Sequence, residues 1–277
     1  MAEFEEDPHD FDVYARVAPE ARTYHHIHFD TAAGIARLTL NRAPANVLSI
    51  EMMEEISAAL ESLEYERAVK LVVFMAQGKY FSVGFEIPDH TGDRAYLMLE
   101  GLRRIVENLG KLDKPTLAVV AGPATGAGSV IAAACDMVLA AEKAAKFGHP
   151  EIRAGVFNTV AAALLPRLVG RKRAYEMLLG GGLLTAAEAE RVGLITRAIP
   201  DEKLDSETAA VIQRFQEGSA PVYQYARRAI AGGLDLTLAD AVRHAEDVYL
   251  NPLLNTEDVE EGLRAVTEKR KPQWKDR

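Results

Sequence analysis

The chain has 277 residues, 48% of them hydrophobic and 26% charged, so it is long enough for one large domain or two small ones. Its 41 Asp and Glu residues outnumber its 32 Lys and Arg residues, and the net charge of -9 argues against a general nucleic-acid-binding protein. The longest apolar stretches, such as 71–76 and 130–134, are far shorter than the ~20 residues that a membrane-spanning helix needs.

The N-terminal segment, residues 1–22, holds seven acidic and two basic residues and few aliphatic ones. We expect it to form a poorly ordered acidic arm. An acidic start without an apolar run matches neither a secretory signal nor a transit peptide. The single cysteine, Cys135, permits no internal disulfide, which is typical of a reducing compartment. The sequence therefore predicts a cytoplasmic protein.

From residue 23 onward, strand-like runs alternate with helical patterns. The runs at 24–29 and 35–40 are joined by a turn-like segment, which predicts a hairpin. Ser49 can cap a helix that follows it. Beyond this helix we expect strands at 69–76, 115–121 and 136–141 and helices at 94–112 and 127–134. This alternation predicts an α/β layered core, because apolar strands must be covered on both faces.

After about residue 160 the pattern becomes almost wholly helical. We expect helices at 161–168, 172–179, 186–192, 205–216, 222–230 and 236–250. The predicted organisation is therefore an α/β core over residues 23–204 followed by a helical C-terminal region over residues 205–277.

Two glycine-containing turns follow predicted strands. One is GPATGAGS at 122–129, which opens a predicted helix, and the other is YFSVGFE at 80–86. The first lacks the Lys-Ser/Thr ending of a phosphate loop and the third Gly of a dinucleotide fingerprint. Free N–H groups at the start of a helix favour negative charge, so two such turns can direct two N–H groups at one carbonyl oxygen. The expected site is an oxyanion hole.

Histidines 25, 26 and 28 are the one group of potential metal ligands near the start of the folded part. In a strand, His26 and His28 share one face and His25 lies on the other. No Cys, Asp or Glu at ligand spacing completes a set, so no metal site is predicted.

Several segments, in this combination and order, resemble the crotonase superfamily, also called the enoyl-CoA hydratase/isomerase family. They are NRAPANVLS at 41–49, FSVGFEI at 81–87, AGPATGAG at 121–128, CD at 135–136, FGHPE at 147–151, PRLVG at 166–170 and GLI at 193–195. The resemblance covers about residues 23–275. It implies a spiral of ββα units whose C-terminal helices mediate trimer formation, often as a dimer of trimers. It also implies an acyl-CoA thioester substrate and no cofactor apart from the coenzyme A of that substrate.

The same resemblance implies the residues that hold the thioester. The backbone N–H groups of Phe85 and Ala127 are expected to bind its carbonyl oxygen as negative charge develops there. The family usually has Gly at the second position, so Ala127 suits the role only if its Cβ is accommodated. Coenzyme A is expected beside Ala43, Ala45 and Ile87.

Simple hydratases of this family use two Glu residues. One corresponds to Glu151, whereas the other falls on Val130, which cannot transfer a proton. A third family position often carries Asp in dienoyl isomerases and in a related dehalogenase, and here it is Asn158. An Asn can hydrogen-bond water or a ring substituent, but it is not a general base. We expect Asn158 to bind substrate.

One carboxylate and an oxyanion hole are compatible with two reactions, hydration of an unsaturated acyl-CoA or movement of its double bond. Within the family, segments 44–48 and 84–90 most resemble cyclohexa-1,5-diene-1-carbonyl-CoA hydratases, which add water to a cyclic dienoyl-CoA. His90 is a candidate for placing that water. A third possibility is an acyl-CoA-binding homologue without activity, and no nucleic-acid or membrane partner is expected in any of these cases.

Overall fold

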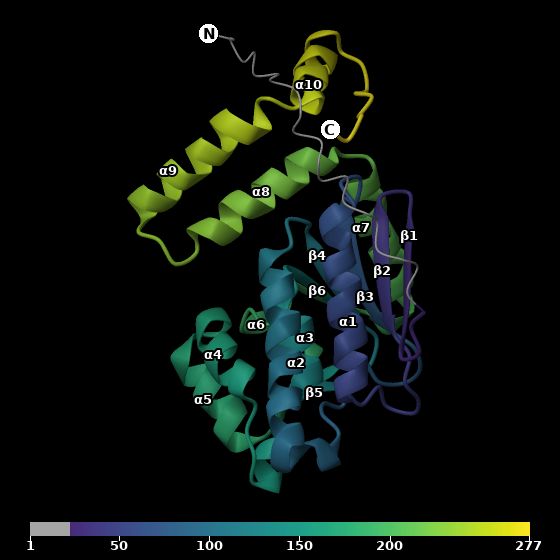
Figure 1. Cartoon of the computed structure of the whole chain (residues 1–277), viewed down its shortest axis with the longest axis vertical. Coiled ribbons are helices and arrows are strands. Elements are labelled where there is room, and N and C mark those ends of the chain that lie inside the picture. Colours follow the sequence, from purple (N-terminus) through teal and green to yellow (C-terminus); the bar gives the residue numbers. More distant parts are fainter. Residues whose placement is uncertain (1–22) are drawn as a thin grey trace, which may run out of the picture.

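A computed structural model describes residues 23–277, so the acidic arm predicted for residues 1–22 lies outside the described residues. The centre of the fold is a six-stranded sheet in the order β1-β2-β3-β4-β6-β9 (Figure 1). Its strands are β1 (Ile27–Ala32), β2 (Ile35–Leu40), β3 (Leu71–Ala76), β4 (Thr116–Val120), β6 (Met137–Ala141) and β9 (Arg197–Ile199). The β1–β2 pair is the antiparallel hairpin expected from the sequence, and the other neighbouring strands run parallel.

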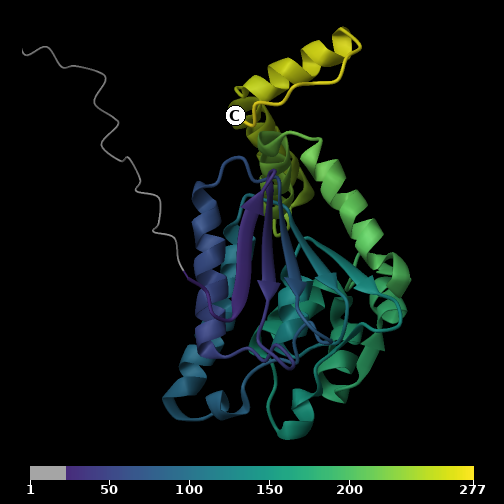
Figure 2. The ribbon, with the colours of Figure 1, turned by 90° about the vertical axis from the view of Figure 1, so that its right-hand side faces the viewer.

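Helices cover both faces of this sheet. The helices α1 (Ile50–Ser62) and α2 (Gly92–Lys111) lie against each other on one face, and α7 (Leu204–Gln216) lies on the other (Figure 2). As predicted, the Ser49 hydroxyl caps α1 by accepting a hydrogen bond from the Met52 N–H at 3.2 Å. The central strand β4 is buried along its whole length, and its sequence is apolar after Thr116.

A second, smaller sheet stands beside the first and carries the loops of interest. It contains β5 (Ala124–Thr125), β7 (Lys146–Gly148) and β8 (Leu183–Thr185). The helices α3 (Ala127–Ala134), α4 (Thr159–Leu168), α5 (Gly170–Gly180) and α6 (Ala186–Arg191) complete this part of the chain. The chain after residue 160 is mostly helical, as expected, but it also contains two short strands that were not predicted, β8 and β9. Each has only three residues, too few to show a strand period in the sequence.

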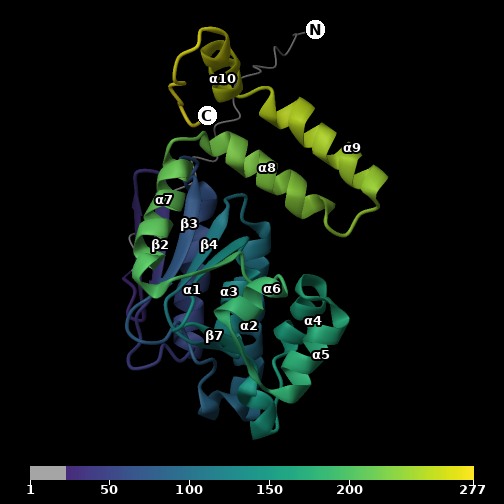
Figure 3. The same ribbon diagram turned by 180° about the vertical axis from the view of Figure 1, so that it is seen from behind.

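The C-terminal helices α8 (Ala220–Gly233) and α9 (Leu238–Val248) form a hairpin above the α/β core, seen from behind in Figure 3. A π-helical turn (Tyr249–Leu253) then leads to α10 (Glu257–Thr267). The predicted α/β class with a helical C-terminal region is confirmed. Within residues 23–277, every helix is too short or too polar to serve as a membrane span.

The last ten residues return from α10 to the core. The Trp274 indole Nε1 donates to the Glu217 carbonyl oxygen at 2.7 Å, and the Asp276 carboxylate lies 3.1 Å from the Lys70 ammonium. Asp258 on α10 accepts a hydrogen bond from the Lys275 N–H at 2.7 Å. These contacts fix the position of α10 relative to the core.

Candidate active site

The two predicted glycine turns lie side by side at the carboxyl ends of β3 and β4. Two backbone hydrogen bonds join them, from the Phe81 N–H to Pro123 at 3.0 Å and from the Thr125 N–H to Ser82 at 2.9 Å. A Cβ built on Gly128 would lie 2.5 Å from the Ser82 carbonyl oxygen, so this close approach requires glycine. Because neighbouring parallel strands end at the same edge of the sheet, the fold itself brings the two turns together.

Among the described residues, no backbone hydrogen bond from the N–H of Phe85 or of Ala127 joins the contacts that hold the two turns together. Leu48 donates to the Gly84 carbonyl and accepts from the Glu86 N–H, so the Phe85 N–H points away from Leu48. Ala127 is the first residue of α3, and its N–H therefore has no acceptor in a preceding turn of that helix. A Cβ built on Gly84 would lie 3.4 Å from the Ala127 nitrogen. The structure thus brings Phe85 and Ala127 to the wall of one cavity, on adjacent turns.

Two positions where the family usually has Gly and Glu carry apolar residues here, Ala127 and Val130. Ala127 is 1% exposed within the hydrophobic core, so the fold accommodates its Cβ and the condition set by the sequence is met. Val130 is also 1% exposed, belongs to the same core and does not line the cavity described below. The structure therefore shows a packing role for Val130.

Glu151 approaches the glycine turns from a short 3₁₀ helix, Pro150–Ala154, that follows β7. Its Oε1 lies 3.1 Å from Nδ1 of the buried His149 ring. Its Oε2 is buried and makes no hydrogen bond within the described residues, and a Cβ built on Gly126 would lie 3.3 Å from it. The carboxylate therefore holds one paired and one unpaired oxygen next to the turn that carries Ala127.

A cavity of about 370 Å³ connects these groups. Its walls are mostly apolar, and the polar side chains among its lining residues are those of His90, Glu151 and Asn158. The complete lining is Val83, Gly84, Phe85, Ile87, His90, Gly126, Ala127, Pro150, Glu151, Ala154, Val156, Phe157 and Asn158. Ile87 is 84% exposed and thus lies at the mouth. Glu151 is the one carboxylate of this lining.

The two polar atoms of the Asn158 amide lie in different environments. Its Oδ1 accepts a hydrogen bond from the Ala161 N–H at 2.9 Å and caps α4. Its Nδ2 is buried without a hydrogen-bond partner within residues 23–277. Since Oδ1 must be the acceptor at the cap, the donor half of the amide faces away from α4.

The loop predicted to meet coenzyme A lies next to the cavity but outside its lining. Ala43 is exposed, and the Ala45 carbonyl accepts a hydrogen bond from the Val83 N–H at 3.2 Å. Asn46 anchors this loop, because its Nδ2 donates to the carbonyls of Gln77 and Tyr80, each at 2.9 Å. The loop is thus attached directly to the turn that carries Phe85.

The Cys135-Asp136 segment is structural. Burial raises the pKa of the Cys135 thiol well above its usual range, so this side chain is no thiolate nucleophile at neutral pH. Asp136 accepts hydrogen bonds from the Thr116 N–H at 2.8 Å and from Arg227 Nε at 2.8 Å. This carboxylate therefore ties α8 to the central sheet.

His149 is the residue at this site that the sequence reasoning missed. In the sequence it is the third residue of the FGHPE segment at 147–151, and a single histidine before a proline gives no reason to assign a role. The available signal was its spacing, two residues before the predicted catalytic Glu151 with a proline between them.

Comparison with known proteins identifies the relatives of this chain. The family model described as enoyl-CoA hydratase/isomerase matches residues 30–277. A protein of Rhizobium meliloti named "probable enoyl-CoA hydratase" is 34% identical over 258 residues, which cover 92% of this chain and 100% of that protein. The cyclohexa-1,5-dienecarbonyl-CoA hydratase of Thauera aromatica is 33% identical over 247 residues, or 88% of this chain and 93% of the relative.

A solved structure shows the same architecture. The crystal structure of an enoyl-CoA hydratase from Bacillus anthracis superimposes with a TM-score of 0.86 at 26% sequence identity, and the match covers 91% of this chain and all of that one. The predicted spiral architecture is thereby confirmed over nearly the whole length of the chain.

Proposed function

The chain belongs to the enoyl-CoA hydratase/isomerase family of enzymes, and from this membership together with the site geometry we propose that it hydrates an unsaturated acyl-CoA thioester. In this proposal the N–H groups of Phe85 and Ala127 bind the thioester oxygen and Glu151 transfers the proton. The observation that carries it is that Phe85, Ala127 and Glu151 line a single cavity, and that Oε2 of Glu151 is buried without a hydrogen-bond partner among the described residues.

The reaction needs one carboxylate if the same group takes and returns the proton. Glu151 accepts a proton from water while the water oxygen bonds to the β-carbon of the double bond, and the electron pair of that bond moves toward the thioester. The negative charge that develops on the thioester oxygen is stabilised by the two N–H groups. Glu151 then delivers its proton to the α-carbon, so that one water molecule is added in total.

We propose Asn158 as the group that holds the attacking water. Its buried Nδ2 has no partner within the described residues and lies on a residue of the cavity wall. An unsatisfied donor in a buried polar site is the kind of group that binds an ordered water. Asn158 would thus supply one of the water contacts that a second glutamate would otherwise provide.

The proposed acyl group is a cyclic dienoyl. The similarity to the Thauera aromatica enzyme and the apolar lining of the cavity support it, and the aromatic ring of Phe157 offers a flat apolar surface for a ring. Coenzyme A would extend past Ile87 at the mouth toward Ala43 and Ala45. The single buried cysteine and the acyl-CoA substrate are the grounds for proposing the cytoplasm as its location.

Double-bond isomerisation by Glu151 alone is the second candidate function, and the burial of Val130 in the core favours it. Here Glu151 removes a proton from one carbon of the acyl chain and returns it to another, with no water added. A homologue that binds acyl-CoA without turnover is the third possibility.

One experiment separates the three. The purified protein is incubated in deuterated water with linear 2-enoyl-CoA, linear 3-enoyl-CoA and cyclic dienoyl-CoA, and the products are analysed by mass spectrometry. Addition of one water to the cyclic substrate is the expected result. A shifted double bond without added water, identified by comparison with the authentic isomer, would show an isomerase, and deuterium uptake would mark exchange of the transferred proton. A thioester that binds, as measured by calorimetry, but is recovered unchanged would show a binding protein.

We also propose that the chain assembles as a homotrimer or a dimer of trimers through its C-terminal helices. Large apolar side chains on α8, α9 and the π-helical turn are exposed in the single subunit. They are Ile230, Leu234, Leu238, Val242, Tyr249 and Leu250. An exposed apolar surface of this kind is typical of a subunit interface.

A further inference from the structure

The environment of Glu151 makes its two oxygens unequal. Oε1 lies 3.1 Å from the His149 ring, whereas Oε2 has no hydrogen bond within the described residues and lies beside Gly126. The side chain of His149 is 1% exposed and that of Glu151 is 20% exposed, so the histidine end of this contact is buried.

The chemistry of the pair fixes the direction of its hydrogen bond. In the proposed reaction Glu151 accepts a proton and must therefore start as a carboxylate, which only accepts hydrogen bonds. The proton between the two groups is then expected on Nδ1 of His149. The other ring nitrogen, Nε2, is buried and has no partner within residues 23–277. The imidazole is therefore engaged in one interaction, and that interaction is with Glu151.

The backbone holds both side chains in a defined relation. Pro150 separates them and begins the 3₁₀ helix that carries Glu151. The proline ring fixes its own φ and restricts the conformation of the preceding His149. The proline thus limits the backbone movement between the two residues. Rotation of the terminal carboxylate is loosely restricted in itself, and the contact with His149 limits it.

We propose that His149 is a positioning residue for Glu151: its Nδ1–H holds Oε1 and thereby presents Oε2 as the oxygen that takes and returns the proton. The inference rests on the proposed function, because it concerns the proton-transfer step of the same site. His149 itself is not among the residues that line the cavity, so it acts through Glu151 and does not touch the substrate.

The kinetic test compares two substitutions. His149→Leu removes the N–H and keeps an apolar side chain of moderate size, whereas His149→Asn retains an N–H donor near the position of Nδ1. We expect His149→Leu to lower kcat about 10- to 100-fold with little change in KM, since a misoriented reacting group has an effect of this order. His149→Asn should recover most of the lost kcat. An unchanged kcat in His149→Leu, or an equal loss in both variants, would overturn the proposal.

A spectroscopic test keeps this inference separate from the proposed function. The ¹⁵N resonances of the His149 ring, assigned by their loss in His149→Asn, should show a protonated Nδ1 in the wild-type protein. In Glu151→Ala this preference should disappear. A ring protonated on Nε2 alone would overturn the positioning role even if the enzyme is active. Conversely, a protonated Nδ1 that depends on Glu151, in a protein that turns over none of the three thioesters, would contradict only the proposed function.

Discussion

Glu151 is the residue on which the proposed chemistry depends. Glu151→Gln keeps the size of the side chain but cannot accept or return a proton, so we expect kcat to fall about 10²- to 10⁴-fold. Binding of a product-like CoA ester, measured by calorimetry, should stay within a few-fold of wild type, because Phe85 and Ala127 contribute backbone N–H groups that the substitution leaves in place. Turnover at the wild-type rate would show that another group moves the proton.

The substitution Val130→Glu tests whether the second glutamate of the family's simple hydratases can be restored at this position. The Val130 side chain is packed in the core, so Val130→Glu would bury an ionisable group without a partner. We expect the free energy of unfolding to fall by about 3 kcal/mol and hydration not to increase. Val130→Leu serves as the control for the change of size. A faster hydratase would mean that this position reaches the substrate after all.

At the site, the sequence predicted the backbone turns better than the side-chain network. Phe85 and Ala127, which the family resemblance implied as donors, both line the cavity beside Glu151, and their role as donors stays a prediction. The pairing of His149 with Glu151 could not be predicted, because it depends on two side-chain rotamers. The sequence also could not predict that Ala43 lies outside the cavity lining, since it does not show where a loop lies relative to a pocket.

Among the elements, α4 is capped by Asn158, the residue that we also propose to hold the attacking water. Asn158→Ala removes both the cap and the Nδ2 donor, and losing such a cap costs about 1 kcal/mol. Asn158→Asp keeps an oxygen to accept the Ala161 N–H but removes the donor. We therefore expect thermal unfolding to be affected mainly in Asn158→Ala, whereas hydration falls in both variants. Hydration that survives in Asn158→Asp would exclude Nδ2 as the group that holds water.

Element boundaries were predicted well where an element is long and poorly where it is short. The helix expected at 94–112 is observed as α2, Gly92–Lys111, because its apolar stripe extends over several turns. The strands β5, β7, β8 and β9 were not predicted, since two or three residues carry no periodicity. Their position is determined by hydrogen bonding to strands far away in the sequence, as when β9 pairs with β6.

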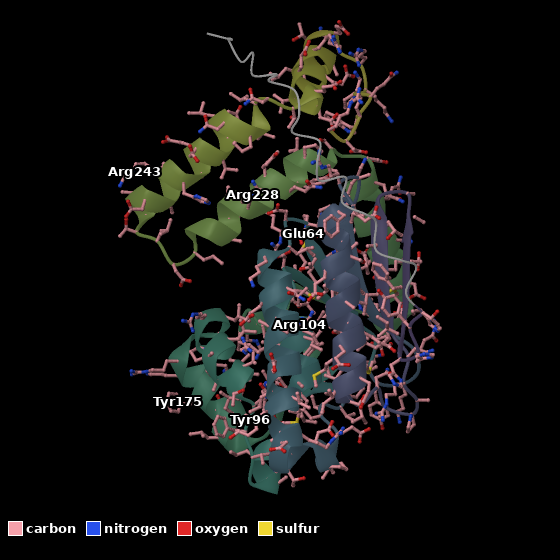
Figure 4. All side chains as sticks on the ribbon, in the orientation of Figure 1. Glu64, Tyr96, Arg104, Tyr175, Arg228 and Arg243 are labelled. Carbon is pink, nitrogen blue, oxygen red and sulfur yellow. The ribbon has the colours of Figure 1, made fainter. Side chains whose placement is uncertain are left out.

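On the scale of the whole molecule, the proposed assembly depends on the C-terminal helices. The exposed apolar side chains proposed for the interface lie on the α8–α9 hairpin and the π-helical turn, whereas the exposed Tyr175 lies on α5, below this hairpin in the view (Figure 4). We expect the double substitution Leu234→Asp and Leu238→Asp to shift the sedimentation coefficient toward that of a monomer. Tyr175→Ser should leave the trimer intact. A trimer that persists in the double variant would place the interface elsewhere.

Acid should loosen the C-terminal part of the fold. Hydrogen bonds from Arg270, the Gln273 N–H and Arg264 hold the pKa of Glu261 well below its ordinary value of 4.5. A carboxylate whose pKa is lower in the folded than in the unfolded chain stabilises the fold fully above that ordinary value, and this contribution is lost as the pH falls below it.

The single tryptophan of the chain, Trp274, reports on this region by fluorescence. As the pH falls below about 4.5, the free energy of unfolding should decrease more in the wild type than in Glu261→Gln. Equal slopes for the two proteins would show that the Glu261 cluster does not contribute to acid sensitivity.

The binding site combines chain segments that are distant in the sequence. Leu48 contacts the Phe85 turn, Ser82 pairs with Ala124, and Glu151 reaches Gly126. None of these segments can hold a thioester alone, so only a chain that has folded through the Glu151 segment binds ligand. A CoA ester that binds only the folded chain should therefore stabilise it. At a concentration one hundred times its Kd, it should raise the free energy of unfolding by about 2.7 kcal/mol.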